Sequence, residues 1–163
     1  MMQTVSARFS SIPGTEAALG WSGAHSILAD RPEGRAGGAG MGFNGAQMLA
    51  LALGACFCND LRYIAHRRQA AIASLWVTVD LDLDGDPVLA LAARMRVGCV
   101  MADGSDPAGL IAEAERSSMV SNSLIRGLPV RVAPADRHEK GPADAGPFHS
   151  CPGRIRSPSS GPA

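Results

Sequence analysis

Charge of one sign, lysine and aromatic side chains are all scarce in this 163-residue sequence. Fifteen Lys and Arg residues balance fifteen Asp and Glu residues, and Lys140 is the single lysine. A protein that binds nucleic acid by electrostatics carries a marked excess or patch of positive charge. We therefore expect no nucleic-acid partner. Hydrophobic residues make up 46% of the chain, which is enough for a core although only 4% of the residues are aromatic.

Long hydrophobic runs are missing as well. The longest apolar stretch extends from Met48 to Cys58, contains one glycine and is too short to span a bilayer. The N-terminal sequence MMQTVSARFSSIPG has neither the charged region nor the apolar region of a signal peptide. The sequence therefore predicts a cytoplasmic protein with no membrane partner.

Cysteine is present at four positions, Cys56, Cys58, Cys99 and Cys151, in a spacing that contains no CxxC pair. A chain of this length without a secretory signal is not expected to use them as a disulfide framework. No histidine lies at zinc-finger spacing from Cys56 and Cys58. We therefore expect no structural zinc site, no other metal and no cofactor.

The composition divides the chain into a folded domain, residues 1–133, and a tail, residues 134–163. The tail contains six prolines and four glycines and has almost no apolar periodicity. Such a segment buries too little surface to offset the entropy of ordering it, so we expect it to be disordered.

In the first part of the domain, the sequence pattern predicts a strand at Thr4–Phe9 and a hairpin formed by Glu16–Gly20 and Ala24–Ala29. A glycine-rich loop is predicted at Arg31–Gly45. The loop lacks the GxxxxGK[ST] pattern of a phosphate-binding loop. A long helix, rich in Ala, Leu and Met, is predicted from Ala46 to Gln69.

In the second part of the domain, the sequence pattern predicts a long hairpin, a helix and a final strand. Ser74–Asp84 alternates strictly between apolar and polar residues, and Val88–Val100 returns after a turn. A helix is predicted from its N-cap at Asp106 to Ser118, and a strand at Leu128–Val132. This order of elements is typical of an α+β fold.

The composition of the first helix indicates that the chain associates with a second copy of itself. Between Met48 and Cys58 it is apolar on every side, and one sheet of a small domain covers only one face of a helix. We therefore expect a homodimer with these helices at its centre.

Three motifs resemble one family. The chain carries RPEG at residues 31–34, GFNGAQMLALALGACFCNDLRYIA at residues 42–65, and AERSSMVSNSL followed by GLPVRV between residues 114 and 132. Their order and spacing resemble the osmotically induced protein C and organic hydroperoxide resistance proteins (OsmC/Ohr). The resemblance covers roughly residues 1–133. It implies an intertwined α+β homodimer, with long central helices wrapped by antiparallel sheets and two active sites at the subunit interface.

The resemblance also implies thiol peroxidase chemistry. The peroxidatic cysteine of the family falls on Cys56, and its arginine falls on Arg31, with Arg35 as the alternative because the following loop is longer here. The family glutamate falls on Ala46 and the resolving cysteine on Ser118, so both groups are missing. A thiolate next to an arginine is able to reduce a peroxide, but its sulfenic acid then needs an external thiol reductant.

Three functions remain open at this point. The first is a one-Cys reductase of small organic hydroperoxides acting through Cys56. The second is a relative without peroxidase activity that binds a small apolar ligand at the dimer interface. The third is a thiol redox or metal sensor using Cys56 and Cys58, although residues two apart on a helix do not face each other. We expect Glu33 as an ion-pair partner of Arg31. Asp60 lies one turn beyond Cys56 on the same helix face, as a polar group of the helix surface or of a pocket mouth.

Overall fold

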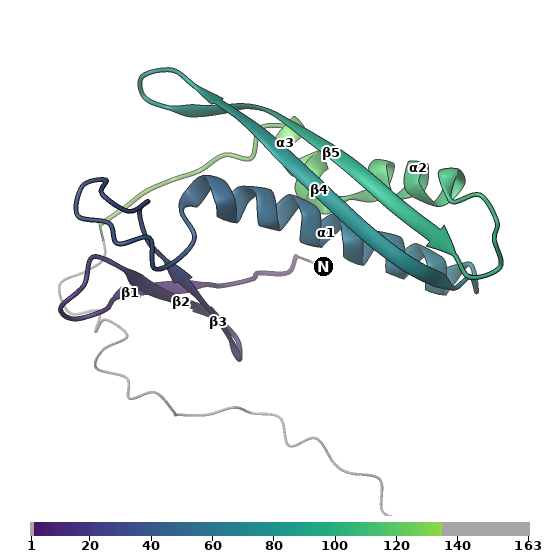
Figure 1. The fold of residues 1–163 in the computed structure, drawn as a ribbon, viewed down its shortest axis with the longest axis horizontal. Coiled ribbons are helices and arrows are strands. Elements are labelled where there is room, and N and C mark those ends of the chain that lie inside the picture. Colours follow the sequence, from purple (N-terminus) through teal and green to yellow (C-terminus); the bar gives the residue numbers. More distant parts are fainter. Residues whose placement is uncertain (1, 135–163) are drawn as a thin grey trace, which may run out of the picture.

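The computed structural model describes residues 2–134. The predicted tail therefore lies almost wholly outside the described residues, and so does Cys151. The described part contains five strands and three helices (Figure 1). In chain order they are β1 (Arg8–Ser11), β2 (Ala18–Ser22), β3 (His25–Ala29), α1 (Gly45–Arg67), β4 (Ile72–Asp84), β5 (Leu89–Met101), α2 (Ala108–Ser117) and α3 (Met119–Ile125).

The N-terminal strands form a small antiparallel sheet in the order β1-β2-β3. Gly23 turns the chain between β2 and β3 with a φ of +58°, a conformation that glycine adopts without strain. The first strand was expected at Thr4–Phe9 but lies at Arg8–Ser11. Its position is set by pairing with β2, in which Arg8 lies opposite Trp21 and Ser11 opposite Ala18.

Helix α1 begins and ends within two residues of the prediction. Its N-cap, Asn44, forms a capping box: the Asn44 side chain accepts the backbone N–H of Gln47, and the Gln47 side chain accepts the N–H of Asn44. His66 and Arg67 lie in the last turn, where positive charge favours the negative end of the helix dipole.

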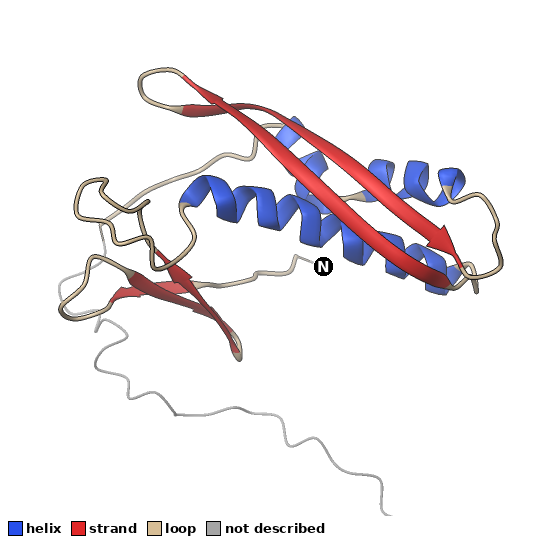
Figure 2. Cartoon of the chain, in the orientation of Figure 1, coloured by secondary structure: helices blue, strands red, loops and turns tan. Residues whose placement is uncertain are grey.

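The strands β4 and β5 form a two-stranded antiparallel hairpin that lies along α1 (Figure 2). Leu75 and Val77 on β4 and Val97 on β5 pack against the core, which confirms the alternation read from the sequence. Gly54 lets the helix approach β4 closely, because a Cβ there would lie 3.2 Å from the Val79 side chain.

The C-terminal elements differ from the prediction at three places. The second helix begins at Ala108 with Pro107 and not Asp106 as its N-cap, although the Asp106 side chain accepts the backbone N–H of Ala108 at 2.9 Å. The second helix breaks at Ser118, whose φ of −59° and ψ of 115° are not helical, and the chain then forms the additional helix α3. The predicted strand at Leu128–Val132 is wrong for the single chain: these residues are exposed and form no strand. Extended residues become a strand only beside the edge of another strand, and no described strand pairs with this segment.

The hydrophobic core lies between α1, the hairpin and α2. Its buried side chains are Phe57, Leu61, Ile64, Ala65, Met101, Leu110 and Ala114. The α+β fold class is thus confirmed. One side of α1 has no cover in the single chain, since Leu51, Ala52, Ala55 and Tyr63 are exposed there.

By length and composition alone, α1 also meets the requirement for a membrane span. Its most apolar window has a mean hydropathy of 1.3, and 28% of that window is buried within the domain. The buried side carries much of the core described above, as is usual for the central helix of a globular domain.

Candidate functional site

Cys56 lies in the middle of α1, on the side that meets the junction between α2 and α3, and its side chain is half-buried. The Ser118 hydroxyl donates a hydrogen bond to the Cys56 sulfur, with an Oγ–Sγ distance of 3.8 Å. The Cys56 thiol in turn donates to Asp60, with an Sγ–Oδ2 distance of 3.6 Å. The thiol therefore has a hydroxyl donor on one side and a carboxylate acceptor on the other.

Ser118 is fully buried and firmly held. Its backbone N–H donates to the carbonyl of Ala114 at 2.8 Å, and its own carbonyl accepts both the backbone N–H and the side-chain amide of Asn122. The break between α2 and α3 is thus fixed by hydrogen bonds on both sides. This rigid break turns the Ser118 hydroxyl toward α1.

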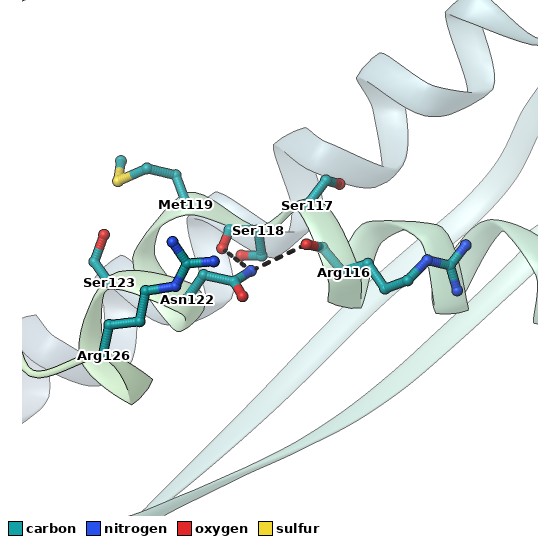
Figure 3. A pocket seen from close by; sticks show the side chains of 7 residues that line it. All are labelled: Arg116, Ser117, Ser118, Met119, Asn122, Ser123 and Arg126. Carbon is teal, nitrogen blue, oxygen red and sulfur yellow. Dashed lines mark hydrogen bonds between the residues drawn. The ribbon is translucent and has the colours of Figure 1, made fainter.

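A shallow depression of about 370 Å³ lies at the same junction (Figure 3). The side chains around it are those of Arg116, Ser117, Ser118, Met119, Asn122, Ser123 and Arg126. In Figure 3 the Arg116 side chain extends away from that of Arg126. The two guanidinium groups therefore do not form a clamp, and Asn122 uses its amide to bind the backbone carbonyls of Arg116 and Ser118.

Arg31 is not brought to Cys56 within one chain. Its guanidinium forms an ion pair with Glu16, with an Nη2–Oε2 distance of 2.6 Å. The expectation that Glu33 pairs with Arg31 is therefore wrong, because Glu16, next to β2, is the carboxylate that reaches it. Among residues 2–134, no hydrogen bond or ion pair connects Arg31 or the alternative Arg35 to Cys56.

The loop that carries Arg31 is held by a buried carboxylate. Asp30 accepts backbone N–H groups from Arg31 at 2.7 Å, Ala39 at 3.1 Å and Met41 at 3.0 Å. The N–H of Met41, with those of Arg31 and Ala39, holds the pKa of the Asp30 carboxyl below its usual value. The glycine-rich loop is thus folded back onto the start of its own segment.

The remaining thiols are separate from this site. Cys58 is a free thiol two residues further along an unbroken helix, so its side chain points away from Cys56. Burial raises the pKa of the Cys99 thiol, and the positive charge of Arg62 opposes that rise. Within the described part of the chain, no group of three His, Cys, Asp or Glu side chains is placed to hold a metal ion.

The sequence placed Asp60 on the same helix face as Cys56, but it did not predict their hydrogen bond. The spacing of four residues on one helix was the available signal, because such residues are neighbours on the helix surface. The first turn of α1, which begins Gly45-Ala46, contains no acidic residue. The carboxylate that meets the thiol therefore comes from the C-terminal direction of the helix.

Comparison with known proteins identifies the family. Residues 37–133, more than half of the chain, match the family model for OsmC-like protein. The chain belongs to the OsmC-like family. No curated protein matches this sequence.

Solved structures of this family share the fold. An OsmC-like protein of unknown function from Vibrio cholerae has a TM-score of 0.65 and 16% identity, covering 75% of this chain and 94% of its own. An OsmC-like protein from Mycoplasma pneumoniae has a TM-score of 0.64 and 17% identity, covering 78% and 91%. An organic hydroperoxide resistance protein OsmC from Legionella pneumophila has a TM-score of 0.56 and 21% identity, covering 78% and 92%.

Proposed function

We propose that this OsmC-like protein is a one-Cys, thiol-dependent reductase of small organic hydroperoxides that acts through Cys56. The observation that supports this most directly is the contact between the Cys56 sulfur and the buried Ser118 hydroxyl. Ser118 stands at the position where the family resemblance places a resolving cysteine, and its hydroxyl lies 3.8 Å from the Cys56 sulfur. Relatives of this fold include proteins described as organic hydroperoxide resistance proteins.

The proposed reaction balances with one protein thiol and two external thiols. The Cys56 sulfur attacks the outer oxygen of the hydroperoxide, the O–O bond breaks, and the alcohol leaves with the proton of the thiol. Cys56 becomes a sulfenic acid. One external thiol condenses with it to a mixed disulfide and releases water, and a second external thiol restores Cys56.

A homodimer is part of the proposal. The uncovered side of α1 exposes 46% of Leu51 and 71% of Tyr63, and the apolar segment at residues 128–132 has no partner strand in the chain. A second copy would cover this face and offer a sheet edge to the segment. It also gives Arg31 a route to the thiol of the other subunit, where a guanidinium stabilises a thiolate and the developing oxyanion. We place this dimer in the cytoplasm, where thiol reductants are abundant.

The proposal is tested by intact-protein mass spectrometry after one equivalent of cumene hydroperoxide. We expect one added oxygen on Cys56 and no intramolecular disulfide, and further oxidation to the sulfinic acid with excess peroxide. Cys58→Ser is the matched control and should give the same product. No oxidation of Cys56, or a rapid disulfide between Cys56 and Cys58, contradicts the proposal.

Ser118→Cys tests the resolving position. A sulfur at this position would lie close to the Cys56 sulfur, so peroxide should now produce a disulfide instead of a lasting sulfenic acid. We expect faster turnover with a dithiol reductant than in the natural chain. Ser117→Cys, one residue earlier and directed to the end of α2, is the control that should form no such bond.

A second function is favoured by one observation. The Cys56 thiol donates its hydrogen to the Asp60 carboxylate, and within one chain no arginine bonds to the sulfur. This arrangement suits a relative that has lost peroxidase activity and binds a small apolar ligand at the dimer interface. Binding of an apolar fluorescent probe by a dimer that cumene hydroperoxide leaves unoxidised would favour this function over the first.

A further inference from the structure

We propose that Asp60 is the acid–base residue of the Cys56 site, accepting the thiol proton and delivering it to the departing alkoxide. This inference rests on the proposed hydroperoxide reductase function. It follows from the geometry around the sulfur: Asp60 Oδ2 lies 3.6 Å from Cys56 Sγ, and Ser118 Oγ lies 3.8 Å away. Asp60 therefore contacts the atom that reacts.

The helix itself holds the carboxylate in place. Cys56 and Asp60 are four residues apart in an unbroken stretch of α1, so their side chains occupy the same face one turn apart. The Asp60 side chain is partly buried, and among the described residues its hydrogen bond is to the thiol and it forms no ion pair with an arginine. Within one chain the carboxylate is therefore bound to no fixed cation and can accept and donate a proton.

Within one chain, neither Arg31 nor Arg62 forms an ion pair with Asp60. Arg31 binds Glu16 beside the N-terminal sheet, and the charge of Arg62 acts on Cys99. The family glutamate is absent, since Ala46 stands at its position. Asp60 is thus the carboxylate that directly contacts the thiol in the described part of the chain.

The proposed step moves one proton and one electron pair. As the sulfur attacks the outer oxygen, the S–H proton passes to Asp60 Oδ2, the S–O bond forms and the O–O bond breaks. The departing alkoxide is strongly basic and takes the proton from Asp60, giving the alcohol. The outer oxygen keeps its own hydrogen and forms the sulfenic acid, and the Ser118 hydroxyl stabilises negative charge on the sulfur by donating to it.

Asp60→Asn separates this role from simple charge repulsion when two reactions of Cys56 are compared. Reduction of cumene hydroperoxide expels an alkoxide that needs a proton, whereas alkylation by iodoacetamide expels iodide, which needs none. We expect Asp60→Asn to slow oxidation by roughly 100-fold, in the range of general acid–base catalysis. Alkylation also has to lose the thiol proton but expels a leaving group that needs none, so it should slow much less than oxidation. Asp60→Glu should recover part of the oxidation rate.

Asp84→Asn, at the exposed end of β4, is the matched control and should change neither rate. If Asp60→Asn is oxidised as fast as the natural chain or faster, the carboxylate only opposes thiolate formation and the inference is overturned. If the variant loses both reactions equally, Asp60 delivers no proton to the alkoxide and the inference is again overturned. If natural Cys56 is not oxidised at all, the proposed function fails and takes the inference with it, and this outcome is recognised in the natural chain alone.

Discussion

The helix–hairpin part of the molecule and its N-terminal sheet differ in how they are stabilised. The core cluster is supplied by α1, β5 and α2, with β4 packed against it. The three-stranded sheet lies at the beginning of α1, away from that core (Figure 1), and between residues 8 and 29 only Ala17 and Gly20 are buried. Cys56 therefore belongs to a part with its own core, whereas Arg31 belongs to a part that is largely unsupported in one chain. Under the proposed function, Arg31 would therefore reach Cys56 only if a second copy covers the N-terminal sheet and the free side of α1.

The largest difference between the two parts is expected in stability. Leu61 is fully buried, so Leu61→Ala should lower the free energy of unfolding by about 3 kcal/mol through lost burial and the cavity it leaves. Leu19 on β2 is 41% exposed, and Leu19→Ala should cost below about 1 kcal/mol. Urea denaturation followed by circular dichroism measures both. Equal losses would show that the sheet shares one core with the helix.

The next effect concerns the uncovered side of α1. Leu51→Glu places a charge on this face, and we expect the dimer to dissociate at least about tenfold more readily because a charge cannot be buried there without a partner. Sedimentation velocity at micromolar concentrations gives the mass. Thr78→Glu, on the exposed face of β4 next to Arg96, is the control and should leave the mass unchanged. A natural chain that sediments as a compact monomer would contradict the dimer.

A smaller, local effect is expected at the Arg31 loop. Folding lowers the pKa of the Asp30 carboxyl, so the ionised carboxylate stabilises the folded loop at neutral pH, which lies above the pKa of the unfolded chain. This stabilisation is lost as the pH falls through the lower pKa of the folded chain. Asp30→Asn should produce the same loosening at neutral pH. Hydrogen exchange of the Ala39 and Met41 amides should become faster, while amides in β5 stay protected. Unchanged exchange at both loop amides would show that other contacts hold the loop.

The smallest effect is expected on the outer face of the hairpin. Arg94 and Arg96 form exposed cross-strand ion pairs with Asp82 and Asp80. Ion pairs in water contribute little, so Arg96→Gln should leave the urea midpoint nearly unchanged. A large loss would mean that this face is covered in solution.

The sequence alone determined those helices and strands that are specified by neighbouring residues. The alternation in Ser74–Asp84 predicted β4 with its inner face, and the Ala-, Leu- and Met-rich composition of Ala46–Gln69 predicted α1. Helix α3 was missed because its β-branched and serine residues favour helix only weakly, and here the turn at Ser118 and the Asn122 hydrogen bonds start a new helix. The strand expected at residues 128–132 was wrong for one chain, since pairing depends on an edge that the sequence of the segment does not contain.

For the candidate site the sequence, through its resemblance to the family, named Cys56, Arg31 and Ser118. It also predicted, from apolar residues on every side of α1, that one chain would leave part of this helix uncovered. Tertiary structure decided which named groups meet: Ser118 and Asp60 contact the Cys56 sulfur, whereas Arg31 pairs with Glu16. The reason is physical. Periodicity and capping act over a few residues and are written in the sequence, but a contact across 62 positions depends on where the break after α2 turns one hydroxyl toward the helix.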